Sequence, residues 1–232
     1  MEVIIMNIPK RTSADITDVK VNKEFTYKDI PVLKLEVSYP QLNCRRNPES
    51  ARRINRICKN YADCVCLFAQ RQLYPEAIRG YKYSMENDFP FNAYETVLAY
   101  NVTCNESCIF SCYFDRYEYT GGAHGTTYRT SVNCNLYNGM VINLSDICVS
   151  RYYRRKLLEQ ILEQADGNLA LNPGIYFENY RELIVKHFST CNFCITPQGI
   201  DIYYQQYAIA PYSTGIVVFS IPCDVPDQYF NR

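Results

Sequence analysis

The residue whose chemistry most needs an explanation is His124, one of only two histidines among 232 residues. It lies in a glycine-rich stretch, residues 117–131, which reads YEYTGGAHGTTYRTS. An imidazole can act as a general base or bind a metal ion. As the base of a hydrolase it would need a carboxylate to assist it, and Asp115 or Glu118 could do so.

No complete catalytic or metal-binding set accompanies this histidine. The sequence contains no nucleophile elbow, no phosphate-binding loop and no His-Glu-x-x-His pattern. A metal site would need two or three further ligands, whereas His187 falls on the apolar stripe of an expected helix. We therefore expect a protein that is not an enzyme and that uses neither a metal nor a cofactor.

The neighbouring glycines offer a structural explanation for the same stretch. Gly121, Gly122 and Gly125 permit positive φ angles and close backbone approach, so the chain can turn sharply between two strands. The imidazole of His124 could then hydrogen-bond main-chain groups that the turn leaves unpaired. We favour a structural corner here, and a part in a ligand groove and catalysis stay open as alternatives.

The overall charge argues against a nucleic-acid partner. Lys and Arg number 24 and Asp and Glu also number 24, which gives a net charge of zero. A basic group, Arg45, Arg46, Arg52, Arg53, Arg56 and Lys59, is interpreted as the solvated face of a helix rather than an anion site. No apolar run reaches the roughly 18–20 residues of a membrane span. The start lacks a signal-peptide pattern, so we expect a cytoplasmic chain, or an extracytoplasmic part given without its anchor.

The twelve cysteines can be either disulfides or core thiols. Cys104, Cys108 and Cys112 lie in an expected hairpin whose turn is residues 105–107. We favour three small hydrophobic residues on one core face, and a single Cys104–Cys108 bridge across the loop is the alternative. The Cys191-x-x-Cys194 motif has no second pair and is a weak metal or redox signal.

Strands dominate the expected secondary structure. Leu33, Leu35, Val37 and Tyr39 alternate with polar residues and predict a strand over residues 31–40. Asn47 and Pro48 can begin a helix that extends to about residue 68, and residues 81–92 are expected to be a connection. Asn138-Gly139 predicts a second hairpin turn.

The second half also contains helix patterns. One helical region is expected after Ser145 or Ser150, and another after Pro173 with His187 on its buried side. Two strands are expected near the C-terminus. The whole pattern predicts an α+β fold with antiparallel sheets covered by helices. We expect two tightly associated subdomains, residues 1–119 and 120–232.

Several segments resemble a known domain family. YEYTGGAHGTTYRTS, LYNGMVINLSDIC and GIDIYYQQYAIAPYSTGIVVFSIP, in this order, resemble the family typified by the extracytoplasmic region of the anti-sigma factor RsiV. VLKLEVSYPQL and NPESARRINRI resemble its companion domain, which also accompanies the catalytic domain of the peptidoglycan deacetylase PdaC. The resemblance spans about residues 16–226. It implies a receptor for a lysozyme-like protein, as in RsiV, while the chemistry of PdaC belongs to a separate domain.

Tyrosines supply the candidate ligand contacts, because their rings are apolar and their tips are polar. The candidates are His124 with Tyr119, Tyr128, Tyr204, Tyr207 and Tyr212. Our leading hypothesis is a non-catalytic binding or sensory module for a lysozyme-like protein or a peptidoglycan fragment. The alternatives are a cell-wall hydrolase that uses His124 with a carboxylate, and a cytosolic protein-interaction domain.

Overall fold

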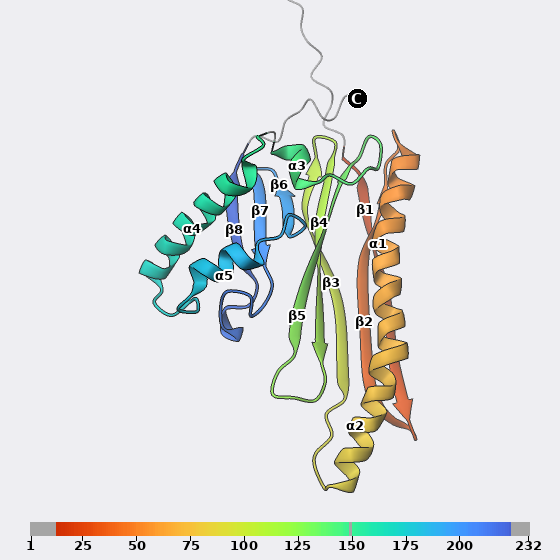
Figure 1. The fold of residues 1–232 in the computed structure, drawn as a ribbon. Helices are drawn as coiled ribbons and strands as arrows, with labels where there is room; N and C mark the ends of the chain where they lie inside the picture. The colour runs from red at the N-terminus through yellow and green to blue at the C-terminus, as the bar shows by residue number, and fades with distance from the viewer. Residues whose placement is uncertain (1–12, 149, 224–232) are drawn as a thin grey trace, which may run out of the picture.

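The computed structural model describes residues 13–148 and 150–223, and its strands form two sheets (Figure 1). Helices α1 and α2 lie along the five-stranded sheet, and α4 and α5 lie on the far side of the three-stranded sheet. The predicted α+β class is therefore confirmed.

The strands are β1 (Asp15–Tyr27), β2 (Ile30–Asn43), β3 (Tyr94–Glu106), β4 (Ile109–Tyr119), β5 (Thr126–Asn135), β6 (Phe193–Thr196), β7 (Gly199–Tyr204) and β8 (Val217–Pro222). The helical segments are α1 (Pro48–Phe68), the π-helical turn η1 (Ala69–Leu73), α2 (Tyr74–Glu86), α3 (Leu144–Ile147), α4 (Tyr153–Leu171), α5 (Tyr180–His187) and the 3-10 turn η2 (Tyr212–Thr214).

The strand order follows the chain order in both sheets, β1-β2-β3-β4-β5 and β6-β7-β8. All the described neighbours run antiparallel except β2 and β3, which are parallel. The parallel pair arises because the helical segment from α1 to α2 carries the chain back along the sheet before β3 begins. The expected antiparallel arrangement thus holds with this one exception.

Strand β1 precedes the first strand that the sequence predicts. As an edge strand it pairs only with β2, and it mixes apolar residues with charges such as Asp18 and Lys20. Charges on an edge strand discourage pairing with another molecule. The same charges blur the alternating pattern, which explains why the sequence alone did not predict this strand.

Helix α1 begins at Pro48, as predicted, although the side chain of Asn47 makes no capping hydrogen bond. The helix continues beyond Phe68 through η1, where the amide of Tyr74 bonds to the carbonyl of Ala69, five residues back. Pro75 follows directly and has no amide hydrogen to donate, so the regular pattern is broken at this point. Residues 81–86 belong to α2, so the expected connection over residues 81–92 is corrected to 87–93.

The hairpin between β3 and β4 is tighter than expected. Its turn has two residues, Ser107 and Cys108, with φ angles of 51° and 64°, which match the twist of the strands. Cys104 consequently pairs with Ser111 and does not face Cys108. A register shift between Val102 and Cys104 also turns Cys104 away from the Cys112 face. The three cysteines therefore do not share one core face.

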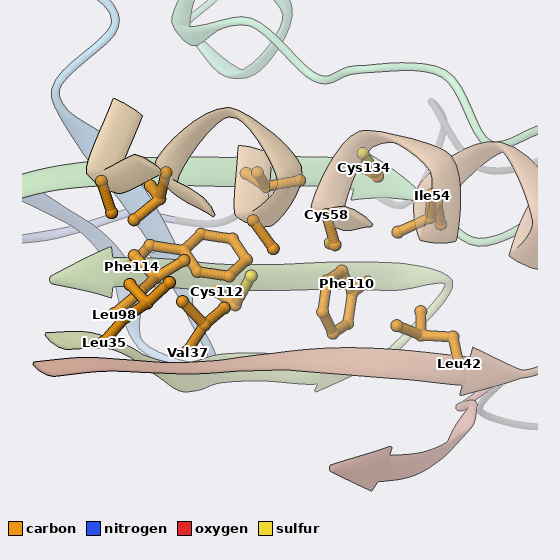
Figure 2. Close-up of a cluster of buried hydrophobic side chains, with 14 of the residues drawn as sticks. Leu35, Val37, Leu42, Ile54, Cys58, Leu98, Phe110, Cys112, Phe114 and Cys134 are labelled. Carbon is orange, nitrogen blue, oxygen red and sulfur yellow. The ribbon is translucent and has the colours of Figure 1, made fainter. Parts of the chain in front are cut away.

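The first core lies between α1 and the five-stranded sheet (Figure 2). Phe110, Cys112 and Phe114 alternate along β4 and point toward α1, where Ile54 and Cys58 are fully buried. All twelve cysteines are thiols, so the alternative bridge between Cys104 and Cys108 is not formed. The buried thiols fill the core as small apolar groups, and burial raises the pKa of Cys134 to about 12.

The second core lies between the three-stranded sheet and the helices α4 and α5. Leu157 and Ile161 of α4 and Ile184 of α5 face the sheet. His187 is exposed in the last turn of α5, so the expected buried histidine is corrected. His187 keeps helical spacing with Tyr180 and Ile184, but it is the last residue of α5, and the buried stripe of the helix ends at Ile184.

The two sheets meet where β6 crosses the face of β3, β4 and β5 opposite to α1. The amide of Ile195 donates to Ser111 Oγ at 3.0 Å and to Asn133 Oδ1 at 3.2 Å. The carbonyl of Ile195 accepts from Thr103 Oγ1 at 2.8 Å, and Asn133 Nδ2 donates to the carbonyl of Phe193 at 2.9 Å. These polar side chains satisfy the open edge of β6, and we call Thr103, Ser111 and Asn133 the polar rail.

The five-stranded sheet continues through β5 to Asn135, beyond the division predicted at residue 119. That division stays a prediction. Within the described residues, no helix combines the length and the apolar character needed to cross a membrane.

Candidate functional site

Residues 120–125 connect β4 to β5 and form a glycine corner. Gly121 has a φ of 86°, in the left-handed region that glycine adopts without strain. At Gly125 a Cβ would lie against the ring of Tyr117 and 2.5 Å from the carbonyl oxygen of Glu118, so the close approach excludes a side chain. Gly122 has no positive φ, and the nearest atom to its Cβ would be 4.0 Å away. The corner therefore requires two of its three glycines.

His124 is exposed at the tip of this corner and contacts two tyrosines. Its ring stacks on Tyr212 with the centroids 3.9 Å apart and the planes 20° from parallel. The hydroxyl of Tyr207 lies 3.4 Å from Nε2, and Nδ1 lies 3.3 Å from the carbonyl oxygen of Gly125. One neutral tautomer satisfies both contacts, with Nδ1 donating and Nε2 accepting. We call His124, Tyr207 and Tyr212 the aromatic cluster.

The two tyrosines lie on the segment between β7 and β8. Tyr207 has a φ of 65° and its side chain is 46% exposed. Tyr212 begins the turn η2, and its ring centroid is 5.8 Å from that of Tyr207. A left-handed conformation is strained for a bulky residue, by about 1–2 kcal/mol. The sequence therefore keeps a tyrosine where a glycine would be easier to accommodate.

Comparisons with known proteins divide the chain into two parts. Residues 27–127 match the family described as deacetylase PdaC, and residues 145–224 match a family of unknown function, DUF3298. We call residues 27–127 the PdaC region and residues 145–224 the DUF3298 region, after the families that they match. Both matches agree with the composition expected from the sequence, although neither description names RsiV.

Solved structures support the same assignment at the level of the fold. A DUF3298-family protein from Bacteroides fragilis has a TM-score of 0.61 and 21% identity, and the match covers 92% of each chain. Another from Pseudomonas aeruginosa has a TM-score of 0.55 and 18% identity, and covers 90% of this chain and 91% of its own. The comparison with curated proteins found no match.

The aromatic cluster joins the two family regions. His124 lies within the PdaC region, whereas Tyr207 and Tyr212 lie within the DUF3298 region. The two motifs that the sequence analysis singled out, about 80 residues apart, thus meet in space. Figure 1 shows the loop between β4 and β5 at the end of its sheet away from the two ends of the described chain.

The carboxylate of Asp115 forms a salt bridge with Arg129. Both of its oxygens accept hydrogen bonds from Arg129, at 2.8 and 2.7 Å. The guanidinium also lies 3.7 Å from the ring centroid of Tyr113. Asp115 projects away from the Cys112 face of β4, and it holds β4 to β5 where the DUF3298 region packs.

Glu118 lies on the opposite face of β4, with its carboxylate 2.8 Å from Nε of Arg116. Neither atom has a hydrogen bond of good geometry, so the contact is an ion pair without hydrogen-bond alignment. Burial raises the pKa of Glu118, and the charge of Arg116 opposes that effect only in part. The two carboxylates considered as partners of His124 are therefore each paired with an arginine. Among the described residues, no group of three or more His, Cys, Asp or Glu side chains could hold a metal ion.

The other tyrosine candidates lie outside the aromatic cluster. Tyr204 is 1% exposed, packs edge-on against Phe219 and donates to the carbonyl of Ile184 at 3.1 Å. This burial removes Tyr204 from the set of candidate ligand contacts. Tyr128 is exposed beside Arg116, and Tyr119 is half-buried at the end of β4.

Two residues that the sequence analysis did not consider, Gln205 and Gln206, bind the backbone of β5. Gln205 bonds to Arg129 and Gln206 bonds to Thr127. Their position directly before Tyr207 is the only signal in the sequence that could have drawn attention to them. The strand that they bind could not be inferred, because it lies about 80 residues away in the chain.

Proposed function

We propose that this chain is a non-catalytic recognition module whose ligand contacts the aromatic cluster. The observation that carries the proposal is the conformation of Tyr207, a half-exposed aromatic residue in the left-handed region. Strained residues of this kind occur preferentially at functional sites. Because Tyr207 is half-exposed, packing in the core does not explain why an aromatic residue occupies this position. Contact with a ligand explains it better.

The chemistry of the cluster supports binding more than catalysis. Its members are three rings with polar tips, which suit both a protein surface and a sugar. A hydrolase would need a carboxylate or a nucleophile beside His124, but Asp115 and Glu118 are held by arginines. The imidazole itself contacts a carbonyl and a phenol, which orient it without activating it.

The ligand candidates come from the resemblance and from the family descriptions. The match to the family described as deacetylase PdaC, together with the resemblance to the companion domain of a peptidoglycan deacetylase, supports a peptidoglycan fragment, and the resemblance to RsiV supports a lysozyme-like protein. For this chain we propose one of these two ligands, a lysozyme-like protein or a peptidoglycan fragment, at the aromatic cluster.

Calorimetric titration with lysozyme and with soluble peptidoglycan fragments tests the proposal. We expect one ligand to bind, and Tyr207→Ala and Tyr212→Ala each to weaken binding by at least about tenfold, equivalent to about 1.4 kcal/mol. Tyr128→Ala removes an exposed tyrosine outside the cluster and is the matched control. Binding of neither ligand, or equal binding by the cluster variants and the control, would show the proposal to be wrong.

A further inference from the structure

The open edge of β5 is closed by side chains in place of a strand. β5 is the last of the described strands in its sheet. Residues 140–142 bond to its end at residues 133–135, but along residues 127–129 no described strand pairs with its outer side. Gln205 Oε1 accepts from the amide of Arg129 at 2.9 Å, and Gln205 Nε2 donates to the carbonyl of the same residue at 2.7 Å. Gln206 Oε1 accepts from the amide of Thr127 at 2.9 Å. The two glutamines thus take the place of a sixth strand along residues 127–129.

These hydrogen bonds lie directly beside the aromatic cluster. Thr127 follows His124 by three residues, and Gln206 immediately precedes Tyr207. The backbone is extended from Thr126 onward, so fixing Thr127 against Gln206 sets where the corner meets the tyrosine segment. Three hydrogen bonds to half-buried backbone groups outweigh one ring stack at the surface. The glutamine contacts therefore contribute more to holding these two segments together than the stack of His124 on Tyr212 does.

We propose that Gln205 and Gln206 are the positioning residues of the aromatic cluster. They dock the DUF3298 region on the PdaC region at this end and determine whether the imidazole and the phenol rings meet. The biological meaning of this inference rests on the proposed function. The positioning itself can be measured on the free protein, without any ligand.

Proton NMR of the two histidines provides the measurement. The ring current of Tyr212, 3.9 Å away, should shift the Hε1 signal of His124 from its unfolded-state position. Because the chain has only two histidines, His187→Gln identifies the remaining signal as His124. In the double variant Gln205→Ala/Gln206→Ala we expect His124 Hε1 to move most of the way to its unfolded-state position while His187 stays in place. Gln164→Ala is the matched control, because it removes a glutamine bond to the backbone of Ser220 away from the cluster.

Glutamate substitutions separate positioning from a general effect on stability. Toward the described residues Gln206 bonds only through its oxygen, so Gln206→Glu keeps the acceptor for Thr127 and should preserve the His124 shift. Gln205 also donates to the carbonyl of Arg129, and Gln205→Glu would place a carboxylate oxygen against that carbonyl. We expect the shift to be lost in Gln205→Glu and kept in Gln206→Glu.

The outcomes distinguish this inference from the proposed function. An unchanged His124 signal in the double alanine variant, or equal effects of the two glutamate variants, would overturn the positioning role. If the shift responds as expected but neither lysozyme nor peptidoglycan fragments bind, the positioning role stands and the proposed function fails.

Discussion

His124 and Gly125 are neighbours in the chain, but they serve different purposes. Gly125 is required because the ring of Tyr117 and the carbonyl of Glu118 occupy the space of a Cβ. His124 is exposed, and apart from its contact with the carbonyl of Gly125 its contacts are with side chains of the other family region, so the turn depends less on it than on Gly125. The glycines thus allow the sharp turn, and the turn holds the imidazole of His124 at the surface.

The requirement for Gly125 leads to a prediction about stability. We expect Gly125→Ala to lower the free energy of unfolding by about 1–3 kcal/mol, because the added methyl group must displace backbone as well as the Tyr117 ring. Gly122→Ala should change it little, since nothing lies within van der Waals distance apart from the carbonyl oxygen of His124 at 4.0 Å. Urea denaturation of the two variants compares them directly, and equal stabilities would contradict the assignment.

A second prediction at the residue scale concerns Glu118. Burial raises its pKa above the ordinary 4.5, so the folded protein binds this proton more tightly than the unfolded chain. Its contribution to stability is therefore complete below pH 4.5 and is lost as the pH rises through the raised pKa. Glu118→Gln stays neutral at every pH, so we expect it to be more stable than the natural protein at pH 7. The difference should shrink as the pH falls through the raised pKa toward 4.5, and a difference in unfolding free energy that is constant with pH would disprove this.

At the contact between the two sheets, side chains hydrogen-bond the backbone at the outer edges of both β6 and β5. The edge of β6 bonds to the polar rail on the five-stranded sheet, and the edge of β5 bonds to Gln205 and Gln206 from the other sheet. Each region thus satisfies backbone groups of the other, which a strand pairing between the sheets would otherwise do. The arrangement fastens the three-stranded sheet of the DUF3298 region to a five-stranded sheet whose strands β2, β3 and β4 lie in the PdaC region.

The polar rail should be sensitive to a single substitution. Asn133→Ala leaves the carbonyl of Phe193 without its donor and takes one acceptor from the amide of Ile195. We expect a loss of about 1–3 kcal/mol in the free energy of unfolding, the usual effect of leaving a buried polar group unsatisfied. Asn101→Ala, at an exposed position of β3, is the control and should be nearly neutral. Thermal and urea unfolding measure both, and equal effects would argue against the rail.

Local patterns predicted the elements whose signals are local. The alternation around Leu33 and the Asn47-Pro48 pair correctly marked β2 and the start of α1. The direction of Cys104 was mispredicted because a register shift inverts the alternation, and a shift depends on the partner strand. The aromatic cluster was predicted as two separate motifs, since residue types identify candidates but only the fold brings them together. The glutamines were missed for the same reason.

At the scale of the whole molecule, polar contacts join the two sheets along β6 and β5, and Cys104 and Ile109 of the five-stranded sheet also pack in the second core. The first core contains Cys134 and lies under α1, while Cys194 is buried on β6 in the other sheet. Burial raises the pKa of each of these thiols from 9.0 to about 12. In the native state the reactive thiolate at either position is therefore much rarer than in the unfolded chain.

These two thiols can report whether the halves unfold together. We expect pulsed alkylation in increasing urea, followed by mass spectrometry, to label Cys134 and Cys194 over the same range of denaturant. The physical reason is that separating the two sheets would leave the amide of Ile195 and the backbone of Arg129 without their hydrogen-bond partners. Partial unfolding would therefore be unfavourable in free energy. Exposed Cys64 and Cys191 should react without denaturant and serve as internal controls. Labelling of Cys194 while Cys134 stays protected would show that the DUF3298 region opens by itself. The polar rail and the glutamines would then form a reversible contact between two units that unfold independently. They would not join the two halves into one cooperative unit.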